Sequence, residues 1–105
     1  MNVSRENIVA LAILAQLGGH RLTAMTGAKD FAYTARSLTF RLPSNFAAKG
    51  INCVRITLNG LDLYDVDFMK IRGTLPIRIV ATQENIYGDA LRALVSDTTG
   101  LSLSL

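Results

Sequence analysis

The residues best suited to catalysis are His20 and Cys53, the single imidazole and the single thiol of the 105-residue chain. A general base or a nucleophile works with partners at hydrogen-bonding distance, and neither residue stands in a motif such as Gly-x-Ser-x-Gly. His20 follows two glycines in an expected loop, and Cys53 lies in an expected strand near Arg55. A nearby cation lowers a thiol pKa, but a free cysteine is more often a small buried apolar side chain. We therefore predict no catalytic residues and a protein that is not an enzyme.

An acidic trio is the best candidate for a metal site. Asp65 and Asp67 share one face of an expected strand, and Asp62 lies near the start of that strand. Hard cations prefer clustered carboxylates. The spacing lacks the alternating acidic residues, the glycine and the distal glutamate of a calcium loop. The segment Thr26-Gly27-Ala28-Lys29 likewise lacks the Gly-x4-Gly-Lys-Ser/Thr frame of a phosphate loop. We therefore predict no bound metal and no cofactor.

Charge is distributed unevenly along the chain. Eleven Lys and Arg stand against eight Asp and Glu, which is a net charge of +3 at pH 7. Residues 1–58 carry seven basic and two acidic side chains, whereas residues 59–105 carry four basic and six acidic ones. A positive surface region attracts anionic partners, nucleic acids in particular. The imbalance therefore directs attention to the basic residues.

Three arginines are expected on one face of the sheet. Strand alternation puts Arg41, Arg55 and Arg78 on the face opposite the apolar rows. Guanidinium groups gathered on one face need water, an external anion or carboxylates of the same chain. Pairing with Asp65 and Asp67 and binding of an external anion are both open alternatives.

Aromatic residues alternate with cations in one segment. Phe31 and Tyr33 lie between Lys29 and Arg36, an arrangement in which cations bind phosphates and rings stack on bases. The signatures of RNA-recognition domains, zinc fingers and helix-turn-helix domains are missing, so we expect contacts mainly to a nucleic-acid backbone. Phe31 is equally compatible with the core. The candidate anion-binding residues are Lys29, Arg36, Arg41, Arg55 and Arg78, with Phe31 and Tyr33 as candidate stacking residues.

Length and composition indicate a single domain over residues 1–105. Half of the residues are hydrophobic, and a chain of this size buries roughly two thirds of its unfolded surface without staples. With only Cys53 present, no intramolecular disulfide forms, and we expect a reducing compartment such as the cytoplasm. The apolar run Ile8–Ala15 is far shorter than the roughly 20 residues that span a bilayer. We expect neither a transmembrane helix nor a signal peptide.

Helical spacing of apolar residues marks both ends of the sequence. The first helix is expected after a cap at Ser4, with Glu6 in its first turn, and ends at Gly18. Its apolar face comprises Ile8, Leu11, Ala12 and Ala15, widened by Val9, Ile13 and Leu17. The second helix is expected to begin near Asn85 or Asp89 and to end at Thr99-Gly100. Its apolar residues are Ile86, Ala90, Leu94 and Val95.

Between the helices the apolar period is two, which is typical of strands. Strands are expected over residues 37–42, 53–58, 61–71 and 75–79. Asn59-Gly60 predicts a tight hairpin, Gly73-Thr74 a second turn, and a slip in parity at Lys70 and Ile71 predicts a bulge. The expected fold is α+β, with an N-terminal helix, an antiparallel meander of about four strands and a C-terminal helix. Both helices pack on one sheet face.

Four segments spread over most of the chain resemble one known family. They are Ile13–Gly19 (ILAQLGG), Met25–Phe31 (MTGAKDF), Ser37–Pro43 (SLTFRLP) and Thr99–Leu101 (TGL). These segments are similar to a family of small uncharacterised proteins of bacteriophages and mobile elements. The resemblance implies a genomic context and supplies no reaction and no catalytic residues. Small phage accessory proteins are commonly DNA-associated factors or inhibitors of host defence, which is an argument by association.

Two functions follow as expectations. The first is a non-enzymatic accessory protein that binds nucleic acid or a nucleoprotein complex through a basic sheet face. The second is a protein-interaction module, either an inhibitor of host defence of the anti-CRISPR type or a self-associating structural protein. In that case the alternating tail Leu101, Leu103 and Leu105 forms an exposed edge. The expected partners are thus a nucleic acid or nucleoprotein, a host protein or a second copy of the chain, and no membrane.

Overall fold

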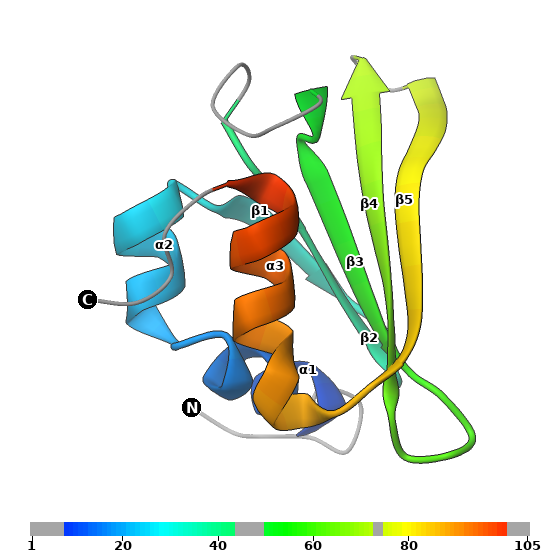
Figure 1. The fold of residues 1–105 in the computed structure, drawn as a ribbon. Coiled ribbons are helices and arrows are strands. Elements are labelled where there is room, and N and C mark those ends of the chain that lie inside the picture. Colours follow the sequence, from blue (N-terminus) through cyan, green and yellow to red (C-terminus); the bar gives the residue numbers. More distant parts are fainter. Residues whose placement is uncertain (1–7, 44–49, 73–74, 101–105) are drawn as a thin grey trace.

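An antiparallel sheet with helices on one of its faces forms the fold (Figure 1). The computed structural model describes residues 8–43, 50–72 and 75–100. The elements are α1 (Ile8–Gln16), α2 (His20–Thr26), β1 (Lys29–Tyr33), β2 (Ser37–Arg41), β3 (Cys53–Leu58), β4 (Tyr64–Arg72), β5 (Leu75–Ile86), the 3-10 turn η3 (Gly88–Ala90) and α3 (Leu91–Thr99). The strands lie in sequence order, β1-β2-β3-β4-β5. The α+β class and the one-sided helix layer are confirmed, with five strands in the meander instead of four.

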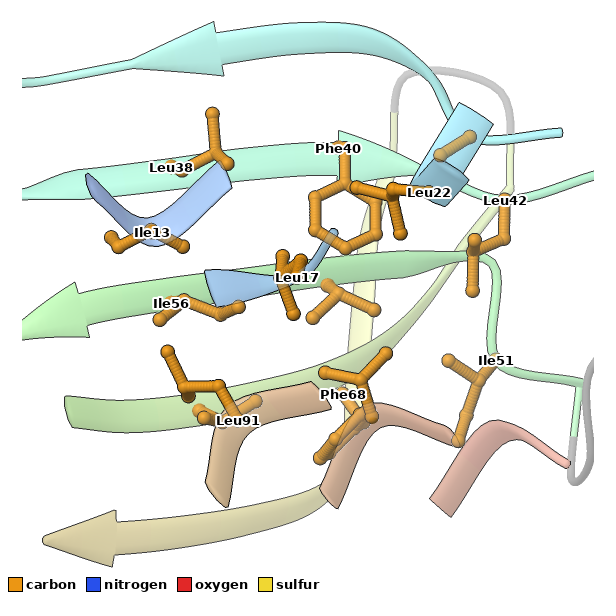
Figure 2. Close-up of a cluster of buried hydrophobic side chains, with 14 of the residues drawn as sticks. Ile13, Leu17, Leu22, Leu38, Phe40, Leu42, Ile51, Ile56, Phe68 and Leu91 are labelled. Atoms are coloured by element: carbon orange, nitrogen blue, oxygen red, sulfur yellow. The ribbon is translucent and has the colours of Figure 1, made fainter. Parts of the chain in front are cut away.

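The core lies between the helices and the inward rows of β2, β3 and β4. Figure 2 shows Ile13, Leu17, Leu22 and Leu91 reaching from the helix layer toward the strands. Alternation along the three strands supplies the opposing surface, with Leu38, Phe40, Val54, Ile56, Val66 and Phe68 all buried. The period of two read from the sequence therefore predicts the core face of these strands correctly.

The first helix turns a different stripe toward the sheet than the main face expected from the sequence. Ala10 and Ile13 are the buried residues of α1, and Leu17 just after it is also fully buried. Ile8 is 52% exposed, so the expected main face lies partly toward solvent. The residues that pack against the sheet are Ile13 and Leu17, which the sequence predicts at the margin of the expected apolar face. Gly18, at φ 107°, follows the end of the helix, and the expected cap at Ser4 and Glu6 lies outside the described residues.

Two elements were not expected from the sequence, α2 and β1. His20 begins α2 instead of lying in a loop, and Gly27 ends this helix at φ 75°, donating its N–H to the Thr23 carbonyl at 2.9 Å. All five residues of β1 are exposed. An edge strand with no buried row shows no apolar alternation, so periodicity could not reveal it.

The last strand is longer and less regular than expected. Its register with β4 shifts three times, between Tyr64 and Val66, Phe68 and Met69, and Lys70 and Ile71. In each shift the extra residue is on β5, so the bulge expected near Lys70 is present but belongs to the neighbouring strand. β5 continues to Ile86, which rules out a helix start at Asn85.

The C-terminal helix begins later and ends where expected. The turn η3 leads into α3, whose buried residues are Leu91, Val95 and Thr99. Gly100, at φ 74°, donates its N–H to the Ser96 carbonyl and closes the helix. Left-handed glycine is the usual helix end, and the Thr99-Gly100 prediction is confirmed. The expected tail strand Leu101, Leu103 and Leu105 lies outside the described residues.

Candidate anion-binding site

No described helix covers the second face of the sheet (Figure 1). Residues paired across antiparallel strands share a face, so the register defines two rows on this uncovered face. The first, here called the cationic row, is Lys29, Arg41, Cys53, Met69 and Ile79. The second, the polar row, is Ala32, Thr39, Arg55, Asp67 and Thr82. Two of the five predicted cations therefore meet in one row, and a third lies in the next.

Arg55 is paired within the chain. Its Nη2 and Nε donate to Asp67 Oδ2 at 2.9 and 3.2 Å, and the Thr82 hydroxyl donates to Asp67 Oδ1 at 2.9 Å. The side chain of Arg55 is 45% exposed and that of Asp67 is 17% exposed. The internal pairing left open by the sequence is thus present for this arginine. Much of its charge is neutralised before any partner arrives.

Arg36 is held by backbone carbonyls. Its Nε donates to the Leu58 carbonyl and its Nη2 to the Asn59 carbonyl, both at 3.1 Å. The Leu58 N–H in turn donates to the Arg36 carbonyl at 2.8 Å. This arginine ties the turn between β1 and β2 to the end of β3, a structural role that leaves it away from the cationic row.

Arg78 lies on the opposite face from Arg41 and Arg55. Arg78 pairs with Lys70 of β4. Lys70 follows Met69, which lies on the uncovered face, so Lys70 and its partner Arg78 lie on the face that the helices cover. Its neighbour Ile79 takes the place on the uncovered face and is 54% exposed. The prediction that three arginines share a face is wrong for Arg78, because the bulges of β5 change its parity relative to the rest of the sheet.

The aromatic residues of β1 also face away from the cations. The Phe31 ring packs against Phe40, with ring centroids 5.7 Å apart, and Tyr33 pairs with Leu38. Both partners belong to the core face, whereas Lys29 belongs to the uncovered face. A register shift between Lys29 and Ala32 allows this change of side. The alternation of cations and rings seen in the sequence therefore does not form one surface.

Lys29 and Arg41 are the predicted residues that the structure brings together. They are paired across β1 and β2 and line one cavity of about 170 Å³ at the end of the cationic row. The other lining residues are Asp30, Leu42, Pro43, Asn52 and Ile71. Asp30 and Asn52 were not singled out from the sequence. No local signal marks them, because they reach the cavity only through the pairing of β1 with β2 and the approach of β4.

The walls of the cavity are held by short contacts. The Asn52 amide donates to the Ile71 carbonyl at 2.6 Å and accepts from the Ile71 N–H at 2.7 Å, which continues the pairing of β3 with β4 through a side chain. On another side, a Cβ added at Gly27 would stand 2.8 Å from Pro43 Cγ. The turn that leads into β1 thus lies directly against the end of β2.

Cys53 pairs with Arg41 across β2 and β3, and its thiol is not activated as a nucleophile. It is 2% exposed although its row faces away from the helices. Burial raises the pKa of the Cys53 thiol, and the charges of Arg41 and then Arg55 lower it by less. At neutral pH the thiol therefore keeps its proton, which agrees with a structural residue and not with a nucleophile.

Two of the three acidic residues, Asp65 and Asp67, are occupied by hydrogen bonds. Asp65 Oδ1 accepts from the Asn59 amide at 3.0 Å and the Asn85 N–H at 3.1 Å, and Asp67 is taken up by Arg55 and Thr82. Within the described ranges, no group of three or more His, Cys, Asp or Glu residues is arranged to hold a metal ion. The side chain of His20 lies outside the described part of the structure.

Comparisons with family models, with curated proteins and with solved structures find no match to this chain. Among the helices described, none has the length and apolar character needed to cross a membrane. The function is therefore argued from the geometry of the uncovered face alone.

Proposed function

We propose that this protein is a non-enzymatic binding protein whose uncovered sheet face contacts the phosphate backbone of a nucleic acid. Lys29 and Arg41 are the proposed primary contacts. The observation that carries the proposal is their pairing on a face without a helix layer, where both also line one cavity. Adjacent cations on an open surface favour a chain of phosphates, since each neutralised phosphate releases a counterion.

The surroundings of this pair support a backbone contact. Thr39 and Thr57 lie half-buried on the same face, and threonine hydroxyls commonly donate to phosphate oxygens. Arg55 is a secondary contact, because a guanidinium group has five N–H donors and Asp67 takes only some of them. Arg41 makes further contacts within the chain, and the same donor count lets it hold a phosphate as well.

The test is the salt dependence of binding to short single-stranded and double-stranded oligonucleotides, followed by fluorescence anisotropy. Each phosphate contact contributes a slope of about −0.9 to a plot of log affinity against log salt on duplex DNA. Lys29→Ala and Arg41→Gln are each expected to flatten the slope by about one contact. Arg92→Ala, which removes an exposed cation from α3 on the covered side, is the matched control and leaves the slope unchanged.

Two results would count against the proposal. One is the lack of any salt-sensitive complex, and the other is an equal effect of Arg92→Ala and Lys29→Ala. Thermal unfolding of each variant separates lost binding from lost structure. The exposed Lys29 is the more informative position, since its side chain contributes little to the core.

A second candidate is a protein-interaction module built on the edge strand β1. Phe31 is 42% and Tyr33 53% exposed, and β1 is an edge strand of the described sheet, a position that favours pairing with another strand. Self-association is expected to weaken in Tyr33→Asp, measured by light scattering; a monomer at all concentrations speaks against self-association. An origin in phages or mobile elements, inhibition of host defence and a cytoplasmic location stay predictions from the sequence.

A further inference from the structure

We infer that the cavity beside Lys29 and Arg41 favours RNA over DNA, with the Asp30 carboxylate accepting a hydrogen bond from a ribose 2′-hydroxyl. This inference rests on the proposed function, because the two cations hold the neighbouring phosphate. It adds the class of nucleic acid and the group that is recognised.

The residues that line the cavity include two basic ones, Lys29 and Arg41, and one acidic one, Asp30. A carboxylate beside a phosphate is unfavourable unless the ligand also brings a hydrogen-bond donor, because like charges repel and an ionised carboxylate only accepts. A phosphodiester has no donor, and neither does the deoxyribose inside a DNA strand. Ribose carries a 2′-hydroxyl, the group by which proteins distinguish RNA from DNA. The sugar-phosphate unit of RNA therefore satisfies Lys29, Arg41 and Asp30 together.

The position of Asp30 is set by the backbone of β1. Asp30 has φ 56°, in the left-handed region, and lies where the register with β2 shifts between Lys29 and Ala32. This irregularity brings Asp30 to the lining of the same cavity as the preceding lysine. In a regular strand, consecutive side chains point to opposite faces.

The size of the cavity limits what enters it. Its volume of about 170 Å³ is below the roughly 300 Å³ at which pockets for drug-sized ligands begin. A sugar and a phosphate fit, while the base stays outside. Recognition is thus expected to depend on the sugar and to be independent of sequence. The contacts of Asn52 with Ile71 and the closeness of Gly27 to Pro43 keep this shape.

The experiment compares single-stranded RNA, DNA and 2′-O-methyl RNA of one sequence by fluorescence anisotropy with the full chain. RNA is expected to bind about tenfold more tightly than DNA, as one hydrogen bond to a charged acceptor provides. The 2′-O-methyl strand keeps the ribose but has lost the donor, so it is expected to bind like DNA. If it binds like RNA, the shape of the strand is recognised instead of the hydroxyl, and the inference is overturned.

The matched variants are Asp30→Gly and Asp62→Gly. Both aspartates are exposed and left-handed, at φ 56° and φ 60°, and glycine adopts this conformation without strain. Each variant loses one negative charge, so general affinity rises in both. Only Asp30→Gly is expected to bring the ratio of RNA to DNA affinity close to one. A ratio that persists in Asp30→Gly, or that falls equally in Asp62→Gly, overturns the role of Asp30.

Failure of the inference is distinguishable from failure of the proposed function. Equal, salt-sensitive binding of RNA and DNA by the unmodified chain overturns the inference and leaves the proposed function intact. Absence of a salt-sensitive complex with any of the three strands overturns both.

Discussion

Cys53 is a buried thiol on a sheet face that no described helix covers, flanked in its row by Arg41 and Met69. Burial raises its pKa above the ordinary value of 9.0. As the pH rises past that value, the thiol of the unfolded chain loses its proton before the thiol of the folded chain does. Stability contributed by the neutral thiol is therefore complete below pH 9.0 and is lost as the pH rises toward the folded-state pKa.

We expect Cys53→Ala to reduce this alkaline loss of stability. The free energy of unfolding, measured by urea denaturation at a series of pH values above 9.0, falls less steeply in the variant than in the unmodified chain. All other ionisable side chains are the same in both proteins, so the difference between the curves isolates the thiol. Parallel curves would show that Cys53 does not contribute.

The ion pair of Arg55 and Asp67 is a second property of single residues. Because Arg55 is 45% exposed, water screens the pair, and a double-mutant cycle with Arg55→Met and Asp67→Asn is expected to give a coupling of about 0.2–1 kcal/mol. Asn at position 67 keeps an acceptor for the Thr82 hydroxyl. Urea denaturation at low and high salt checks the result, and a coupling that does not change with salt contradicts it.

At the scale of elements, the loop between β3 and β4 depends on Asn59 more than on Gly60. The Asn59 Oδ1 accepts from the N–H groups of Leu61 and Leu63, at 2.8 and 3.2 Å. The positive φ of this loop is at Asp62, not at Gly60. The hairpin expected at Asn59-Gly60 is present between β3 and β4. Its connection is a longer loop in which Asp62 is left-handed, so the two-residue turn expected from Asn-Gly is wrong.

Asn59→Ala is therefore expected to destabilise the protein by about 1–3 kcal/mol, because two backbone N–H groups lose their acceptor. Gly60→Ala is the matched control. Its Cβ would meet no atom within 4 Å, so the change is expected to stay within about 0.5 kcal/mol. Chemical denaturation measures the free energy of unfolding of both variants. A larger loss in Gly60→Ala than in Asn59→Ala would support a tight turn at Gly60 instead.

At the scale of the whole molecule, one sheet face bears the core, and no described helix covers the other. Neighbouring residues of β3 illustrate the division, since Ile56 is fully buried under the helices and Thr57 is half-exposed on the uncovered face. Every strand except the irregular edges follows this alternation. A change of side by a single residue therefore decides whether a substitution removes buried core surface or alters the uncovered face.

The matched pair Ile56→Ala and Thr57→Ala tests this division. Ile56→Ala is expected to lower the free energy of unfolding by about 2–5 kcal/mol through lost burial and a residual cavity. Thr57→Ala is expected to change it by less than about 1 kcal/mol. Thermal and urea unfolding measure both values. Similar losses would mean that both faces are covered, contrary to the layer seen in Figure 1.

The sequence alone determines the central part of this fold. The period of two from Ser37 to Arg41 and from Cys53 to Leu58 assigns the core face correctly, because a strand with one buried row must alternate. Gly100 ends the last helix for an equally local reason, the ease with which glycine adopts a left-handed conformation.

Only the tertiary structure decides which cations share a surface. Lys29 and Arg78 belong to the edge strands β1 and β5, where bulges shift the register, so simple alternation does not predict the face of each residue. Arg36 and Arg55 have suitable positions in the sequence, but their charges are engaged by carbonyls and a carboxylate that lie far along the chain. Local sequence patterns predict the face of a residue where burial of one row in the core requires alternation. Elsewhere, the pairing of strands that are distant in the sequence determines which residues lie together.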